Sequence, residues 1–430
     1  MILSALSAVK PQLPKRKVKV LAGSANTERS NQVRLAQNVL VFLALASITY
    51  FFAHSFDKRA NGVDFPEFYA AARMVSEGCG HQLYDFQAQD RFQIRYAGRT
   101  GTYYNHPPFE TLLYLPFSFW SLHAAYLLWC LFNAGVLTYT AIVFQRHVCD
   151  RLDWRVLLLL FFLFPPVLLN FLQGQDSLLL LLIMTLAVVA MKRGRNFTAG
   201  CLLGCGLFKF HVILSFALLV ASLGKKGLLR GLALVFVTLL LISTGISGWG
   251  FLTAYPRFLM KLSSLALAGI HPAQMANLRG LVGVSGIVPD PAARLALTLA
   301  GSVAILWLAW RCFRGNQSKF AGVAGLAFAD LAFGNFVLAA ILVSYHLSPH
   351  DLCIALLPVG LLSQYLASGA GIPRWARLIL ISCQCVFFLP PLHVILLARH
   401  GYAYAGIPIL IMFLLSGGTF AGSCQLRTDS

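Results

Sequence analysis

Two acidic residues near the start of the chain are the first that could do chemistry. Asp64 and Glu67 lie in the segment NGVDFPEFYAAARM, in a chain with only 15 acidic residues among 430. A carboxylate here could act as the general base that takes a proton from an attacking hydroxyl group. The same spacing, with Pro66 between the acids, is also the capping pattern of a helix that stops at Gly78. We therefore predict that Asp64 is a catalytic base, a helix cap or both, with Glu67 as the second candidate base.

Further polar side chains stand in short segments beside or within apolar runs. Lys209 and His211 interrupt one such run, and Arg279 lies in the segment MANLRGLVG. Cations around a departing phosphate stabilise its charge most strongly where water is excluded. The residues expected to bind a donor phosphate are Lys209, Arg279, His346 and His350, and those expected to line the rest of a substrate site are His106, Gln175, Asp176 and Asp351.

Several of these residues have simpler interpretations. Asp176 lies in the tight turn of LQGQDSLLL, where capping of the next span is the favoured interpretation, and Asp351 could likewise cap the span that follows it. His346 and His350 are four residues apart, but the Ser-Pro pair between them disfavours a shared helical face. No third ligand is evident, so we predict no metal site.

The composition indicates which elements position these residues. Hydrophobic residues make up 58% of the chain and charged residues 11%, whereas about a quarter of a soluble protein is charged. The apolar runs are long enough for spanning helices and do not alternate as the strands of a β-barrel do. The net charge of +19 comes mostly from short basic loops between apolar runs, which indicates orientation in a lipid bilayer rather than nucleic-acid binding. We predict an all-α, multi-pass membrane protein.

The basic residues also orient the spans. Residues 1–35 are predicted to be a basic cytoplasmic tail, 36–423 a single membrane domain and 424–430 a second cytoplasmic tail. Basic clusters on both sides of 198–223 predict two half-helices there, with Lys209 near their apex. The loops 55–106 and 248–292 are then outer loops, and the candidate residues converge on the outer face. About ten full spans are expected, at about 36–54, 120–145, 156–172, 177–191, 229–247, 293–310, 320–343, 352–368, 378–397 and 406–422.

A series of motifs resembles a known family. The segments VDFPEFYAAARMVSEG, LYDF, YYNHPPFETLLYLPF, GQDSLLLLLI, AGCLLGCGLFKFHVIL, NLRGL and LSPHDLCIALLP occur in this order. From about residue 36 to 400 the sequence resembles glycosyltransferase family 87, within the GT-C superfamily. The resemblance implies a GT-C-like bundle and a mannosyltransferase-like enzyme of the bacterial inner membrane, with the family's catalytic Asp at Asp64. The family often has Tyr before the Pro pair and Asn after the Gly-Gln pair, where this chain has His106 and Asp176. That difference leaves the acceptor and the exact sugar open.

Two functions therefore stand as hypotheses. The first is an inverting glycosyltransferase that moves a hexose, with mannose as the family's sugar, from a polyprenyl-phosphate sugar to a lipid or glycan acceptor. A lone base without a carboxylate nucleophile predicts inversion, and this reaction requires neither a cofactor nor a metal. The second is a transporter or flippase of a lipid-linked or small polar solute. Asp330, in the middle of a span, would then mark an ion path unless it pairs with a basic residue.

Overall fold

The structure is a computed structural model that describes residues 64–98, 100–264, 271–286, 288–314, 322–368 and 372–425, with isolated positions between 39 and 46. Within these ranges the chain forms helices and no strand. The predicted tail at 1–35, nearly all of the predicted span at 36–54 and most of the tail at 424–430 lie outside the described residues.

The described helices include several that suit a bilayer. Four are long and apolar enough to cross a membrane, namely α5 (Leu122–His147), α11 (Lys226–Ser247), α14 (Pro291–Arg314) and the segment Pro349–Ala367, which joins η6 (Pro349–Ala355) to α16 (Leu356–Ala367). Counting each of three bent pairs as one span gives up to seven. Shorter apolar helices lie in α8 (Ser177–Lys192), α15 (Gly322–Val343) and α19 (Gly406–Gln425). Each span expected after residue 106 therefore has a helix or a bent pair at its place, and the prediction of an all-α multi-pass membrane protein is confirmed.

Two predicted straight spans are bent, and each bend contains a proline pair. α6 (Trp154–Phe162) meets α7 (Pro165–Gln173) at 73°, and α17 (Arg374–Val386) meets α18 (Pro390–Ala398) at 65°. Each second helix begins with two consecutive prolines. Proline has no backbone N–H to continue the hydrogen-bond ladder of the preceding helix. The straight spans expected at 156–172 and 378–397 are corrected accordingly.

The third bend lies where two half-helices were predicted. α9 (Asn196–Cys205) and the segment Leu207–Ala221, made of η3 (Leu207–Lys209) and α10 (Phe210–Ala221), meet at 69°. α9 packs backbone to backbone on α11, because a Cβ atom on Gly200 would lie 2.0 Å from the carbonyl oxygen of Leu228. A Cβ atom on Gly231 would lie 2.1 Å from the carbonyl oxygen of Phe197. This close contact fixes α9, and the break that follows it places Lys209.

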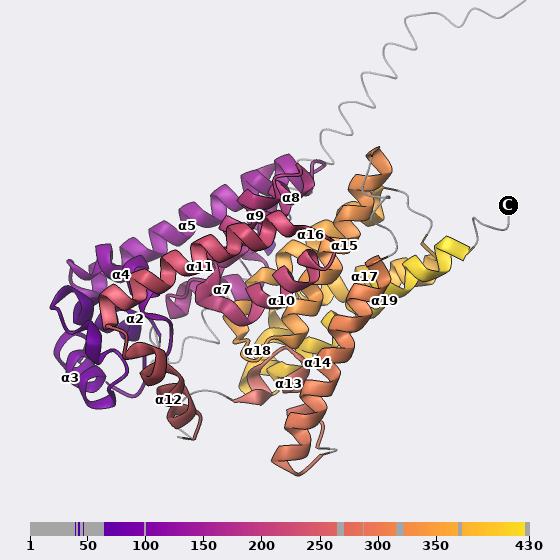
Figure 1. Cartoon of the computed structure of the whole chain (residues 1–430). Helices are drawn as coiled ribbons and strands as arrows, with labels where there is room; N and C mark the ends of the chain where they lie inside the picture. Colours follow the sequence, from indigo (N-terminus) through magenta and orange to yellow (C-terminus); the bar gives the residue numbers. More distant parts are fainter. Residues whose placement is uncertain are drawn as a thin grey trace, which may run out of the picture.

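The helices of the first long loop and the first helix of the second long loop lie at one end of the bundle, which we call the loop end (Figure 1). It holds α2 (Phe65–Ser76), α3 (Phe86–Ala97), α4 (Thr111–Ser118) and α12 (Phe251–Ser264). The hydroxyl of Tyr255 in α12 donates to the carbonyl of Asn105 at 3.1 Å, and the rings of Phe86 and Phe258 stack 4.5 Å apart. Contacts between the two loops therefore build this end, over a buried cluster that contains Phe65, Phe68, Tyr69, Met74, Leu83, Tyr104, Tyr114 and Trp129.

Candidate active site

Asp64 stands immediately before α2, and its carboxylate does not cap that helix. No capping hydrogen bond forms from this side chain. Its Oδ2 atom instead accepts a hydrogen bond from Nε2 of Gln175 at 2.8 Å. Asp64 is partly exposed, whereas Glu67 is buried with 7% of its surface exposed. Pro66 in the first turn and Gly78 after the helix mark its ends as predicted, but the capping interpretation of the Asp64 side chain is wrong.

The turn between α7 and α8 brings Gln175 to Asp64. Gly174 ends α7 with φ +67°, a conformation that glycine adopts without steric strain. A Cβ atom at Gly174 would lie 2.6 Å from Cβ of Phe65, so the turn packs directly on the first residue of α2. Nδ2 of Asn133 donates to the carbonyl of Gln175 at 3.4 Å, which ties the turn to α5 as well. The sequence analysis named Gln175 but gave no role to Gly174.

Lys209 lies at the centre of a buried ion-pair network. Its Nζ atom is 3.4 Å from Oδ1 of Asp176 and 3.2 Å from Oδ1 of Asp351. Only 4% of Lys209 is exposed. Ser177 Oγ donates to the same Asp351 oxygen at 2.8 Å, and Nε2 of His350 lies 3.5 Å from it. The network joins the break between α9 and α10 to the start of α8 and to η6.

The capping roles expected for Asp176 and Asp351 have different outcomes. Asp176 forms no capping hydrogen bond at the start of α8, because its carboxylate faces Lys209. The first N–H of α8 donates instead to Oδ1 of Asn170 at 3.0 Å. Asp351 does cap its helix, which begins at Pro349 rather than at Leu352, because it forms a capping box with Ser348 and accepts a hydrogen bond from the N–H of that residue at 2.9 Å. The same carboxylate also pairs with Lys209.

Glu110 is an acid of the site that the sequence analysis missed. It is buried, with 2% of its surface exposed, and its Oε2 atom lies 3.0 Å from Nδ1 of His106. Burial raises the pKa of Glu110 to about 8 and the pKa of Asp176 to about 7. Asp176 and Glu110 also influence the pKa of each other. The signal in the sequence was the i, i+4 spacing of His106 and Glu110 within HPPFE.

The two acids at the start of α2, Asp64 before it and Glu67 within it, lose their protons at different pH. Burial raises the pKa of Asp64, while the hydrogen bond from Gln175 and the charge of Lys209 oppose the rise. Burial, reinforced by the neighbouring charge of Asp64, raises the pKa of Glu67 well above its ordinary value. As the pH rises, Asp64 therefore loses its proton first, and it is the better base of the pair.

A second group of nitrogen-bearing side chains flanks the ion-pair network. Arg279, on α13 (Leu278–Val284), donates from Nη1 to the carbonyl of Tyr345 at 3.0 Å, and its guanidinium lies 4.1 Å above the Tyr345 ring. The rings of His346 and His211 meet edge to face, 6.4 Å apart. Nδ1 of His350 bonds Oε1 of Gln173. His350 thus belongs to the network around Lys209, whereas Arg279 and His346 lie at its margin.

The predicted site residues therefore come together where the start of α2 meets the turn before α8 and the network around Lys209. Within the described residues, no group of three or more His, Cys, Asp or Glu side chains could hold a metal ion. Direct contacts and mutual electrostatic effects link Asp64, Glu67, His106, Gln175, Asp176, Lys209, His350 and Asp351, with His346 and Arg279 beside them.

Comparison with known proteins identifies the family. The model of glycosyltransferase family 87 matches residues 104–344, more than half of the chain. The chain belongs to glycosyltransferase family 87. No curated protein and no solved structure matches it significantly. The matched segment includes Glu110, Asp176, Lys209 and Arg279, whereas Asp64 precedes it.

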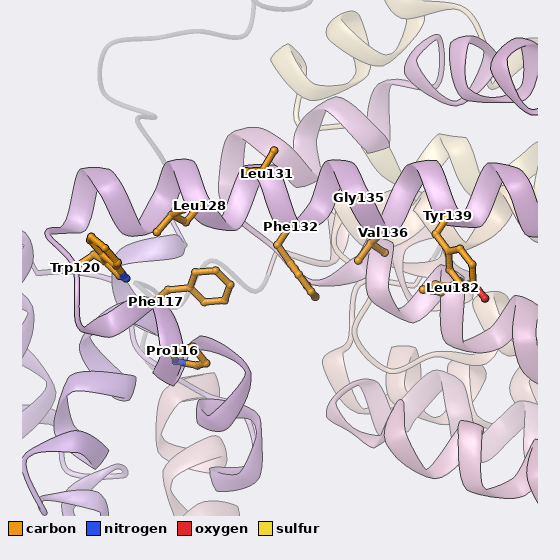
Figure 2. A pocket seen from close by; sticks show the side chains of 10 residues that line it. All are labelled: Pro116, Phe117, Trp120, Leu128, Leu131, Phe132, Gly135, Val136, Tyr139 and Leu182. Atoms are coloured by element: carbon orange, nitrogen blue, oxygen red, sulfur yellow. The ribbon is translucent and has the colours of Figure 1, made fainter.

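An apolar groove runs along this family 87 glycosyltransferase between α4 and α5 (Figure 2). Its volume is about 660 Å³. The rings of Phe117 and Phe132 line it with centroids 6.1 Å apart. From Phe132 a chain of ring contacts passes through Trp129 and Tyr114 to Phe68 in α2. The groove residues are Pro116, Phe117, Trp120, Leu128, Leu131, Phe132, Gly135, Val136, Tyr139 and Leu182.

Asp330 lies apart from the candidate site and is paired. Its Oδ1 atom is 2.6 Å from Nζ of Lys192, which also donates to the carbonyl of His147 at 3.2 Å. Of the two interpretations that the sequence left open for Asp330, pairing with a basic residue is the one the structure supports.

Proposed function

We propose that this glycosyltransferase moves a hexose, with mannose as the family's sugar, from a polyprenyl-phosphate sugar to a hydroxyl group of a lipid or glycan acceptor. Asp64 is the general base. The observation that carries this proposal is the hydrogen bond between Gln175 and Asp64. It holds a partly exposed carboxylate beside a buried charged network, in a position where that carboxylate has no capping role.

The reaction is a single displacement. The acceptor oxygen attacks the anomeric carbon, and the bond from that carbon to the phosphate oxygen breaks, with its electron pair leaving on the lipid phosphate. Asp64 takes the proton of the acceptor hydroxyl as the new bond forms, a contribution of ~10²–10⁴-fold for a well-placed base. A single attack inverts the sugar. Glu67 holds its proton more tightly, so it supports Asp64 rather than replacing it.

We further propose that the loop end faces the extracytoplasmic side of a bacterial inner membrane. The short basic loops of the sequence support this orientation. The apolar groove between α4 and α5 supports a donor carried on a lipid, because its lining would suit a prenyl chain that reaches the site from the bilayer.

The transporter hypothesis has less support. It depended on Asp330 as an ion-coupling acid, and that carboxylate is neutralised by Lys192 at 2.6 Å. The carboxylate that remains accessible among the candidates, Asp64, lies at the loop end rather than along a path across the bundle.

The direct test is incubation of the purified protein with a panel of polyprenyl-phosphate sugars and candidate acceptors, followed by mass spectrometry of the products. We expect transfer of one hexose with release of the prenyl phosphate, and inversion at the anomeric carbon. Retention of configuration, or transport of the intact donor without any product, would contradict the proposal.

A further inference from the structure

The charge balance around Lys209 bears on where a donor phosphate can bind. Lys209 was expected to be a phosphate ligand, yet its ammonium is already shared by Asp176 and Asp351. Asp64 and Glu110 also lie within electrostatic range of it. An anionic phosphate placed there would meet several acids and one cation whose charge is already balanced, so the favourable place for it lies elsewhere.

His211 offers a donor that the fold itself does not use. It is the second residue of α10 and lies two positions after Lys209. Its Nε2 atom is buried and has no hydrogen-bond partner among the described residues. Because a buried polar atom without a partner is destabilising, such an atom commonly marks a site for water, an ion or a ligand. The ring of His211 faces His346 edge to face, at 6.4 Å.

Arg279 supplies positive charge near His346. Its guanidinium donates to the Tyr345 carbonyl from Nη1 and stacks on the Tyr345 ring, and among the described residues no ion pair to a carboxylate is recorded for it. A guanidinium has five N–H donors in a planar fork that suits phosphate oxygens. The pKa of His346 is lowered to about 4, mainly by burial. Arg279 lies near enough to contribute a smaller part of this lowering. His346 is therefore neutral at physiological pH and can donate one N–H.

We propose that His211, His346 and Arg279 form the seat for the phosphate of a prenyl phosphate, and that Lys209 instead holds the surrounding carboxylates in place. This inference rests on the proposed function and deepens it, because it separates the residues that bind the leaving group from those that organise the base. His211 and Asp64 both lie within range of Lys209, Asp351 and His106, so the two parts adjoin each other.

The test is equilibrium binding of farnesyl phosphate to the purified full chain in detergent, with farnesol and inorganic phosphate as separate arms. We expect His211→Ala and Arg279→Gln each to weaken farnesyl phosphate binding by about tenfold or more, the effect of losing one hydrogen bond to a charged group. Farnesol binding should stay unchanged, because the alcohol has no phosphate for the seat to hold. Arg279 is partly exposed and its substitution should leave the fold intact, so it tests the seat if His211→Ala fails to fold.

Two exposed residues of the same types serve as matched controls, and we expect His123→Ala and Arg257→Gln to bind as the unaltered protein does. If both His211→Ala and Arg279→Gln bind farnesyl phosphate with unaltered affinity while the protein still transfers sugar, the seat is wrong and the function stands. If inorganic phosphate alone competes as strongly as farnesyl phosphate, the site is one for free phosphate and the lipid part of the inference is wrong. If the unaltered protein prefers farnesyl phosphate neither to farnesol nor to inorganic phosphate, the proposed donor class fails as well.

Discussion

Replacing Gln175 by Leu tests how the carboxylate of Asp64 is held. The substitution keeps the approximate size of the side chain and removes the amide that donates to Asp64 Oδ2 at 2.8 Å. The other polar atom of the amide, Oε1, has no partner to lose among the described residues. The change therefore isolates one hydrogen bond to an ionised acid.

The expected size follows from that bond. A hydrogen bond to a charged group contributes about 1.5–3 kcal/mol, and because Asp64 is partly exposed we take about 1.5 kcal/mol. At about 1.4 kcal/mol for each pKa unit, the loss raises the pKa of Asp64 by about one unit. The base acts only when deprotonated, so the acid limb of the pH–rate profile should move up by about one pH unit. We also expect a roughly tenfold fall of the alkaline plateau, because the carboxylate is no longer aimed.

The assay is the transfer rate of the purified variant from pH 4 to 9 with saturating donor. Gln364→Leu is the matched control, since Nε2 of Gln364 donates to Oδ1 of Asp150 at 3.1 Å, at the far end of α5 from the loop end. That variant should keep both the acid limb and the plateau. An unaltered profile for Gln175→Leu in folded protein would refute the assigned role of this hydrogen bond.

Three further substitutions test how the site is built. Lys209→Met leaves two buried carboxylates without their counter-ion, so thermal unfolding in detergent should show a loss of about 3–5 kcal/mol; an unchanged melting temperature would contradict the network. Gly174→Ala places a methyl group 2.6 Å from Phe65 at φ +67°, and transfer should fall by at least tenfold, whereas Gly194→Ala, with φ +74° and open space, should change stability by only about 1 kcal/mol and leave transfer intact. Asp330→Asn breaks the pair with Lys192, and we expect lower thermal stability with normal transfer by the protein that remains folded; selective loss of transfer would revive an ion-path role.

The sequence was informative wherever a local rule decided the structure. Apolar runs and basic loops predicted the spans, and charge on both sides of 198–223 predicted the break at Lys209, which α9 and α10 bear out at 69°. Pro66 and Gly78 marked the ends of α2. In each case the structure is determined by residues that are neighbours in the sequence, so it can be predicted without knowledge of tertiary contacts.

The predictions failed where a side chain bonds a residue that is distant in the sequence instead of capping its own helix. Asp64 and Asp176 were both placed correctly at helix starts, yet Asp64 bonds Gln175, 111 residues away, and Asp176 pairs with Lys209. A capping pattern in the sequence cannot show whether a stronger partner lies nearby in space. Glu110 was missed for a related reason, because its burial next to Asp176 depends on how α4 packs at the loop end. The proline pairs at the two bends are visible in the sequence, but the apolar runs on both sides of each pair predict a continuous span.

The most direct measurement is the transfer rate of Asp64→Asn, compared with Glu67→Gln in the same preparation and with the same polyprenyl-phosphate sugar. The asparagine keeps the shape of the side chain but cannot accept the proton of the acceptor hydroxyl. We expect a folded, membrane-inserted protein that has lost at least ~10²-fold of its transfer rate, while Glu67→Gln retains most of its activity. Normal turnover by Asp64→Asn would show that another group takes the proton.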